Sequence, residues 1–282
     1  MTAEPLNGQL SWLGTTVDGR AAEYATAGVG PPVVLLHGWG LTHRTYRRAL
    51  TALADQGAQV WAPALPGFGA TEGIPDSEFS LAGYARWVAS FLDAVGVQGP
   101  VTLIGHSFGG GVAIKTAHDH PERVSRLVCV NSIGGSAWTE NRGVVRSMAQ
   151  RPLWDWGLHL QADLWPWRQA TRVLPVVLEE AVPNLLRNPR AVWRVGHLAR
   201  TADLTHELEE LRRRKLPVVI LWGKQDHVLP AACLASLRDA LGDPEVVTVD
   251  GNHSWLISDP KAFGEIITNI IGLAPTNTDR AA

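Results

Sequence analysis

The chain has 282 residues, of which 45% are apolar and 18% are charged, so it can bury a large core and intrinsic disorder is not expected. The formal net charge is −2 and no basic stripe is visible, which argues against a nucleic-acid-binding protein. No apolar run reaches the ~20 residues that a membrane-spanning helix requires, so no membrane span is expected.

The cysteines and the first residues bear on the cellular compartment. Cys129 stands in an apolar, strand-like run and Cys233 in a helical stretch. Two such cysteines predict no disulfide framework and fit a reducing compartment. The first residues, MTAEPLNGQLSW, lack a basic segment followed by an apolar one, so no secretory signal is expected. We therefore expect a cytoplasmic protein.

Strand and helix patterns alternate over the first hundred residues. In chain order they predict two strands within 9–28, a strand within 31–40, a helix over 42–57, a strand within 58–71 and a helix over 80–96. Asp18 and Gly19 form a common tight turn between antiparallel strands. Ser80 and Gly96 are typical residues at the start and the end of a helix.

The pattern changes after residue 135. Up to that point, a strand over 101–107 passes directly into a helix over 108–121, and another strand follows within 124–134. Residues 136 to about 212 contain no convincing strand, but they hold six of the twelve tryptophans, with Leu and Val at helical spacing. This segment is predicted to be a helical insertion.

The alternation resumes after the insertion, with patterns for a strand, a helix, a strand and a helix at 217–226, 230–242, 244–253 and 259–272. Apolar, β-branched strands separated by helices of this length predict an α/β fold, with a mostly parallel sheet of eight strands and helices on both faces. The expected core comprises residues 1–135 and 213–282, and the insertion comprises residues 136–212.

The segment Gly105-His106-Ser107-Phe108-Gly109 matches the pattern G-x-S-x-G between a predicted strand and a predicted helix. This is the context of a nucleophile elbow, in which a serine occupies a tight and strained turn. Glycines two residues before and after the serine relieve the crowding. The hydroxyl of Ser107 would project above the carboxyl end of the strand, where α/β folds bind ligands. The alternative is that Ser107 only caps the helix.

A serine hydroxyl is a weak nucleophile unless a base takes its proton and a third group orients that base. After a nucleophile elbow the acid and then the histidine follow in the chain. Asp226 and His253 follow two later strands and are the predicted acid and base. The strand before them ends in Asn131 and Ser132, neither of which is a carboxylate. Asp250 is interpreted as a turn residue and is the next candidate acid.

Acyl transfer also needs hydrogen-bond donors for the developing oxyanion. The backbone N–H of Phe108, the residue after the nucleophile, is the first predicted donor. The sequence His37-Gly38-Trp39-Gly40 follows an earlier strand, and its glycines let the backbone approach a reacting carbonyl. The N–H of Trp39 is the second predicted donor, and His37 is expected to bond the loop backbone.

With these motifs, the chain resembles the α/β-hydrolase fold superfamily over about residues 20–272. The segments HGWG, PGFGAT, GHSFGG, WGKQD and GNHSW occur in the order and spacing of that superfamily. The resemblance implies that the serine, aspartate and histidine named above form a catalytic triad, and that the two N–H groups form an oxyanion hole. It also implies that the insertion is a cap over the substrate pocket.

The serine of the elbow separates branches of the superfamily, because haloalkane dehalogenases and epoxide hydrolases have an aspartate there. Esterases, lipases, thioesterases, meta-cleavage C–C hydrolases and cofactor-free haloperoxidases all have a serine. The HGWG loop followed by a serine elbow is similar to that of carboxylesterases, so we expect hydrolysis of a carboxylic ester. The tryptophans of the insertion suggest an apolar or aromatic small-molecule substrate, unless they mainly form its contact with the core.

Two other functions stay open. A meta-cleavage-type C–C hydrolase would need a basic residue for the carboxylate of its substrate, and the insertion offers Arg142, Arg146, Arg168, Arg172, Arg187, Arg190 and Arg194. A non-catalytic member of the fold would bind a small ligand in the same pocket. No metal or organic cofactor is expected, because neither a metal motif such as HExxH nor a phosphate loop is present. The sequence does not select between a monomer and a homodimer.

Overall fold

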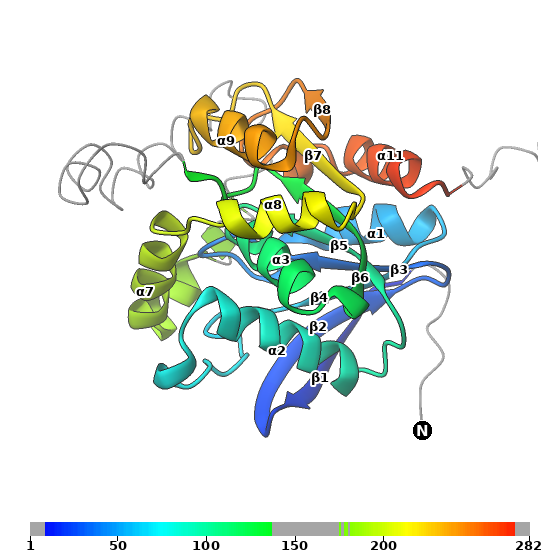
Figure 1. The fold of residues 1–282 in the computed structure, drawn as a ribbon. Coiled ribbons are helices and arrows are strands. Elements are labelled where there is room, and N and C mark those ends of the chain that lie inside the picture. The colour runs from blue at the N-terminus through cyan, green and yellow to red at the C-terminus, as the bar shows by residue number, and fades with distance from the viewer. Residues whose placement is uncertain (1–8, 137–174, 176–177, 180, 274–282) are drawn as a thin grey trace, which may run out of the picture.

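The computed structural model describes residues 9–136, 175, 178–179 and 181–273. It contains an eight-stranded sheet in the order β1-β2-β4-β3-β5-β6-β7-β8 (Figure 1). The strands are β1 (Ser11–Val17), β2 (Arg20–Ala27), β3 (Pro32–Leu36), β4 (Gln59–Pro63), β5 (Val101–His106), β6 (Val124–Val130), β7 (Val218–Gly223) and β8 (Glu245–Val249). β2 pairs antiparallel with β1 and β4, and the other neighbouring strands are parallel. The predicted mostly parallel, eight-stranded sheet is confirmed.

Helices cover both faces of the sheet and bury two apolar clusters (Figure 1). The helices are α1 (Arg47–Asp55), α2 (Leu81–Ala94), α3 (Phe108–Asp119), α7 (Pro189–Arg200), α8 (Thr205–Arg213), α9 (Ala231–Leu241), α10 (Trp255–Ser258) and α11 (Pro260–Ile271). Short 3₁₀ helices are η1 (His43–Tyr46), η2 (Asp76–Glu78) and η3 (Pro121–Arg123). One cluster lies beneath α2, α3, α8 and α9, and the other beneath α1, α10 and α11. The central strands, buried from both sides, are therefore apolar along most of their length.

Local signals in the sequence explain where several elements begin and end. Ser80 accepts the backbone N–H of Gly83 with its hydroxyl at 3.1 Å, and this bond caps the start of α2. Asp18 and Gly19 both have a positive φ, 49° and 77°, as the tight turn between β1 and β2 requires. Gly242 ends α9 in the left-handed conformation. The turn at Asp18 and Gly19 and the cap at Ser80 therefore lie where the sequence predicts them.

The predicted insertion falls partly within the described residues. Val192 and Val195 of α7 join the apolar cluster beneath α2 and α3. Helix α8 packs against α3 and α9. Trp193 is 61% exposed. The other tryptophans of the insertion lie outside the described residues and are Trp138, Trp154, Trp156, Trp165 and Trp167. The boundaries given above for core and insertion stay a prediction.

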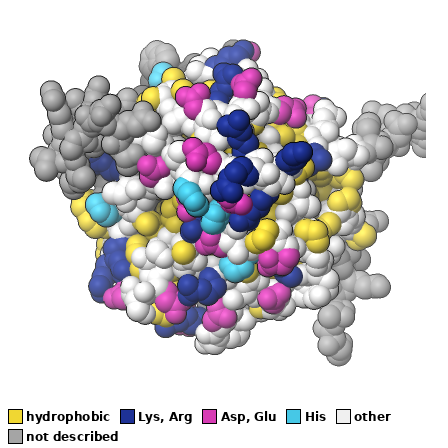
Figure 2. All heavy atoms as spheres, viewed as in Figure 1, with side chains coloured by type: hydrophobic (Ala, Val, Ile, Leu, Met, Phe, Trp, Pro, Cys, Tyr) yellow, Lys and Arg dark blue, Asp and Glu magenta, His cyan; other side chains and the backbone are white. Residues whose placement is uncertain are grey.

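Charges of both signs are interspersed on the face formed by α3 and α8 (Figure 2). Lys115 bonds Asp119 at 3.0 Å and Glu207 at 2.9 Å. Arg214 bonds Glu210 at 2.8 Å. This face therefore presents no field of one sign to a charged polymer. Among the residues placed by the structure, no helix combines the length and the apolar character that crossing a bilayer would take.

Candidate active site

Ser107 occupies a strained turn between β5 and α3. Its φ of 54° and ψ of −117° lie in a region that residues with a side chain rarely adopt. A Cβ atom on Gly105 would lie 2.4 Å from the carbonyl oxygen of Gly109, and one on Gly109 would lie 2.4 Å from that of Leu36. Backbone atoms cannot give way as a flexible side chain can. Both positions therefore require glycine, and the turn holds Ser107 at the carboxyl edge of the sheet.

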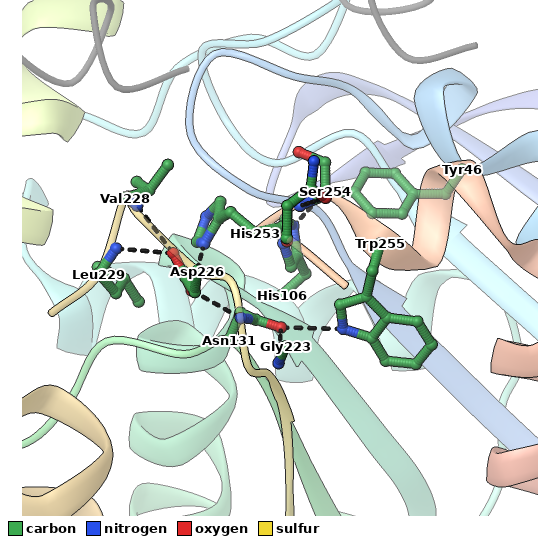
Figure 3. Close-up of polar contacts among 11 residues, drawn as sticks. Tyr46, His106, Asn131, Gly223, Asp226, Val228, Leu229, His253, Ser254 and Trp255 are labelled. Atoms are coloured by element: carbon green, nitrogen blue, oxygen red, sulfur yellow. Dashed lines mark hydrogen bonds and ion pairs between the residues drawn. The ribbon is translucent and has the colours of Figure 1, made fainter. Parts of the chain in front are cut away.

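Asp226 and His253 lie on neighbouring loops at the same edge of the sheet and share a hydrogen bond (Figure 3). Asp226 follows β7, His253 follows β8, and 2.9 Å separates Asp226 Oδ2 from His253 Nδ1. Their side chains are 0% and 6% exposed, so water competes little with the contact. A carboxylate only accepts hydrogen bonds, so Nδ1 carries a proton. In the neutral ring, Nε2 then has the free electron pair that a base needs.

Three further donors hold Asp226. Its Oδ1 accepts the backbone N–H groups of Val228 and Leu229, each at 2.9 Å, and its Oδ2 accepts the side-chain amide of Asn131 at 2.6 Å. Burial acts to raise the pKa of Asp226. The charge and hydrogen bond of His253, with the bonds from Leu229 and Asn131, outweigh burial and hold that pKa below its usual value. Asp226 is therefore a carboxylate at neutral pH.

The sequence analysis considered Asn131 only as a position without a carboxylate. Asn131 follows β6 with a φ of 41°. Its Oδ1 accepts the N–H of Gly223 at 3.3 Å and the indole N–H of Trp255 at 3.0 Å, so its amide has a single orientation (Figure 3). The available signal was an amide at the carboxyl end of a strand, next to the strand that precedes the predicted acid.

A second buried network joins the residue before Ser107 to two loops of the site (Figure 3). His106 Nε2 lies 2.9 Å from the backbone oxygen of His253, and His106 Nδ1 lies 2.6 Å from the hydroxyl of Tyr46. Gly38 donates its N–H to that hydroxyl at 3.0 Å. The rings of His106 and His253 are 4.9 Å apart between centroids. The nucleophile turn and the histidine loop therefore adjoin each other. Neither Tyr46 nor His106 was a predicted site residue.

The loop after β3 packs directly on the turn that carries Ser107. A Cβ atom on Gly38 would lie 3.3 Å from Ser107 Cβ. His37 Nε2 accepts the N–H of Leu65 at 2.8 Å, so Nδ1 carries the proton and donates to the carbonyl of Gly38 at 2.9 Å. The expectation that His37 bonds the loop backbone is confirmed. Phe108 is the first residue of α3, where an N–H has no acceptor within the helix.

The loop that carries Trp39 is also tied to the predicted insertion. The indole N–H of Trp39 donates to the carbonyl of Val192, in α7, at 2.6 Å. Asn184, which is 4% exposed, donates to the carbonyl of Gly40 at 3.0 Å and accepts the N–H of Gly69 at 2.9 Å. The position of the insertion and the position of this loop therefore depend on each other.

Asp250 and His227, the other residues considered for this site, are exposed. Asp250 is 80% exposed at its side chain and bonds Lys224 at 2.9 Å. His227, next to Asp226, is exposed. Over the part of the chain that the structure describes, no three or more His, Cys, Asp or Glu side chains are grouped to hold a metal ion.

Comparison with known proteins places the chain in a family. Residues 31–164 match the family model of the alpha/beta hydrolase fold. An uncharacterized protein of Mycobacterium tuberculosis is 30% identical over 95% of this chain and 83% of its own. A pimeloyl-[acyl-carrier protein] methyl ester esterase of Aeromonas hydrophila subsp. hydrophila is 29% identical over 87% of this chain and 97% of its own. The crystal structure of a membrane phospholipase A, a bacterial virulence factor, superposes with a TM-score of 0.75 and 24% identity over 94% of this chain and 86% of its own. The chain belongs to the α/β-hydrolase fold family.

Proposed function

We propose that the protein is a serine hydrolase that cleaves a carboxylic ester through an acyl-enzyme. The observation that carries the proposal is the buried bond between Asp226 Oδ2 and His253 Nδ1, which leaves Nε2 as a base on a loop adjoining Ser107. The strained backbone of Ser107 supports a role as nucleophile. The Ser107 hydroxyl also makes no capping bond to α3, so helix capping does not explain a serine at this position. The methyl ester esterase among the relatives supports an ester as the substrate.

In the proposed reaction, His253 takes the proton of Ser107 as the serine oxygen attacks the ester carbonyl. The N–H groups of Trp39 and Phe108 stabilise the oxyanion. His253 then gives its proton to the departing alcohol, and water hydrolyses the acyl-enzyme through the same two steps. Asp226 holds the imidazole in the required tautomer and stabilises the imidazolium that forms.

Two of the arginines that could hold the carboxylate of a C–C hydrolase substrate already have a carboxylate partner. Arg190 and Arg194 both pair with Asp76, and the Arg194 guanidinium lies 3.8 Å from the centroid of the Phe79 ring. A substrate carboxylate would have to displace Asp76 from them. The cap arginines that lie outside the described residues are Arg142, Arg146, Arg168 and Arg172. Arg187, the remaining described arginine of this set, is exposed.

The test is the initial rate of hydrolysis of p-nitrophenyl esters, from acetate to palmitate, by the wild type and by Ser107→Ala. The wild type should prefer short or medium acyl chains, and the variant should lose about 10³-fold or more in kcat. Ser132→Ala is the matched control, because Ser132 is also a buried serine and its hydroxyl donates to the carbonyl of Ile133 at 2.7 Å. The control should keep most of its activity.

Labelling with a fluorophosphonate probe separates the other two functions. An activated Ser107 that reacts with the probe, in a protein without activity on any ester, would redirect the search to C–C bonds. A serine that does not react, in a folded protein, would support a non-catalytic ligand-binding protein. Ser107→Ala with most of its ester activity intact would overturn the assignment of the nucleophile.

A further inference from the structure

Tyr46 and His106 form a hydrogen-bonded chain between the two loops that flank Ser107 (Figure 3). At one end the Tyr46 hydroxyl accepts the N–H of Gly38, and at the other end His106 bonds the backbone carbonyl of His253. We infer that Tyr46 and His106 are positioning residues, which hold the loop after β3 and the loop after β8 at fixed places beside the nucleophile. This inference rests on the proposed function.

The direction of every bond in this chain follows from its donors and acceptors. The carbonyl of His253 can only accept, so His106 Nε2 carries a proton. Burial, together with the nearby charge of His253, lowers the pKa of His106 to about 3, so the ring is neutral and Nδ1 accepts the Tyr46 O–H. Burial raises the pKa of Tyr46, so the phenol keeps this proton. The hydroxyl oxygen of Tyr46 then accepts the N–H of Gly38.

The two side chains of this chain are closed off from solvent. Tyr46 is 0% and His106 is 1% exposed. Removal of the Tyr46 hydroxyl would leave the N–H of Gly38 and Nδ1 of His106 buried without a partner, which destabilises the arrangement of both loops. The ring contact between Tyr46 and His106, 5.7 Å between centroids, would survive this change. The hydroxyl can therefore be removed without removing the packing.

The two ends of the chain lie on groups that the proposed reaction uses. Gly38 precedes Trp39, whose N–H is a proposed oxyanion donor. The other end is the backbone carbonyl of His253, the proposed base. A displacement of about 1 Å between reacting groups can cost about 10²-fold in rate. A loop that relaxes by a fraction of this distance would lower kcat without removing any group that touches the substrate.

The test compares Tyr46→Phe with Tyr84→Phe, which changes the same atoms in a similar environment. Tyr84 is 1% exposed and donates its hydroxyl to the carbonyl of Pro66, in the loop after β4, at 2.9 Å. Tyr46→Phe leaves two buried polar groups without a partner and Tyr84→Phe leaves one, so Tyr46→Phe should lose more free energy of unfolding. Tyr46→Phe should lose about tenfold or more in kcat on the best p-nitrophenyl ester, with a much smaller change in KM. Tyr84→Phe should keep the wild-type kcat.

Two variants of His106 test whether the residues act as one chain. His106→Leu removes both bonds of His106 but leaves the bond from Gly38 to Tyr46. Adding Tyr46→Phe to it should therefore lower kcat by less than Tyr46→Phe does in the wild type, because coupled residues do not add. His106→Gln keeps an amide that can donate to the carbonyl of His253 and should recover part of kcat. Fully additive losses, or no recovery with glutamine, would contradict a positioning role for His106.

Amide hydrogen exchange gives a readout that does not need enzyme activity. The amides of Gly38 and of residues 250–254 should exchange faster in Tyr46→Phe than in the wild type, while Tyr84→Phe leaves both loops unchanged. If the wild type neither hydrolyses esters nor reacts with a fluorophosphonate, the proposed function fails, and exchange alone then decides whether the chain holds the loops. Equal kcat and equal exchange in the two phenylalanine variants would overturn the inference.

Discussion

The side-chain amide of Asn131 donates to Asp226 Oδ2 at 2.6 Å, although 95 residues separate the two in the chain. The same carboxylate oxygen bonds His253 Nδ1 at 2.9 Å. Because Gly223 and Trp255 both donate to the amide oxygen of Asn131, the amide cannot turn over. Asn131 therefore fixes the orientation of the Asp226 carboxylate that bonds His253. A substitution of Asn131 can test this role.

Asn131→Asp keeps the acceptors for Gly223 and Trp255 but places a second carboxylate against Asp226. Two such charges cannot both ionise at this distance, so one carboxyl pKa rises in the folded state. A raised pKa stabilises the fold at low pH, and this contribution disappears as the pH rises above about 4. In urea unfolding, the variant should therefore lose more stability relative to the wild type at pH 8 than at pH 5. Asn269→Asp, on an exposed position of α11, should show no such difference.

Asp226→Asn should lose about 10³- to 10⁴-fold in kcat, because an amide no longer selects the tautomer with a free electron pair on Nε2 of His253. Asp250→Asn is the matched control, since Asp250 is exposed and bonds Lys224. Steady-state rates on the same ester will compare the two variants. A near-normal rate for Asp226→Asn with a large loss for Asp250→Asn would move the acid to Asp250.

Gly105→Ala should lower the free energy of unfolding by about 1–3 kcal/mol or more, because its methyl group would meet backbone atoms of Gly109 and Gly110 at 2.4–2.5 Å. Gly73→Ala is the control, since a Cβ there would have no atom within 4 Å. It should change the unfolding free energy by less than about 0.5 kcal/mol. Chemical denaturation measures both values, and equal values would refute the close approach of β5 and α3.

His43→Leu should make the protein less sensitive to acid. His43 is 1% exposed, and neither of its ring nitrogens has a hydrogen-bond partner among the described residues. Burial, with smaller effects from the charges of His37 and Arg44, lowers the pKa of His43 to about 3. Between this value and about 6.5 the unfolded chain binds a proton that the folded protein does not, so the wild type loses stability as the pH falls.

The leucine variant lacks this proton. Relative to the wild type, the variant should therefore be about 2 kcal/mol more stable at pH 5 than it is at pH 8. Urea denaturation at the two pH values measures this difference. If the stability difference between variant and wild type is the same at pH 5 and pH 8, His43 takes up its proton in the folded state as readily as in the unfolded chain.

Much of the sheet could be predicted because its signals are local. Strands β3 to β7 are largely apolar, and Ser80 and Gly242 mark helix ends by their own conformational preferences. The strand order could not be predicted in this way, because it depends on pairing between distant segments. The short helix α10 was also missed, since a single turn carries no periodicity.

In the candidate site, too, residues in local motifs could be predicted and residues joined by long-range contacts could not. Ser107, Asp226 and His253 stand in motifs whose order along the chain predicts their roles, although those roles remain to be tested. The roles inferred for Tyr46 and His106 depend on the hydrogen bond between them, which joins residues 60 apart in the chain. The bond from His106 to the carbonyl of His253 joins residues 147 apart. No local pattern records which buried hydroxyl meets which imidazole. Supporting residues of this kind need coordinates to be found.

The bonds of Trp39 and Asn184 bear on how freely the predicted insertion can be exchanged between relatives. A segment transplanted without an equivalent of Asn184 would leave the carbonyl of Gly40 and the N–H of Gly69 without the partner they have here. It would also need a free backbone carbonyl where Val192 now faces the indole of Trp39. Recombination at the predicted borders of the insertion therefore preserves these contacts only if both attachments travel with it.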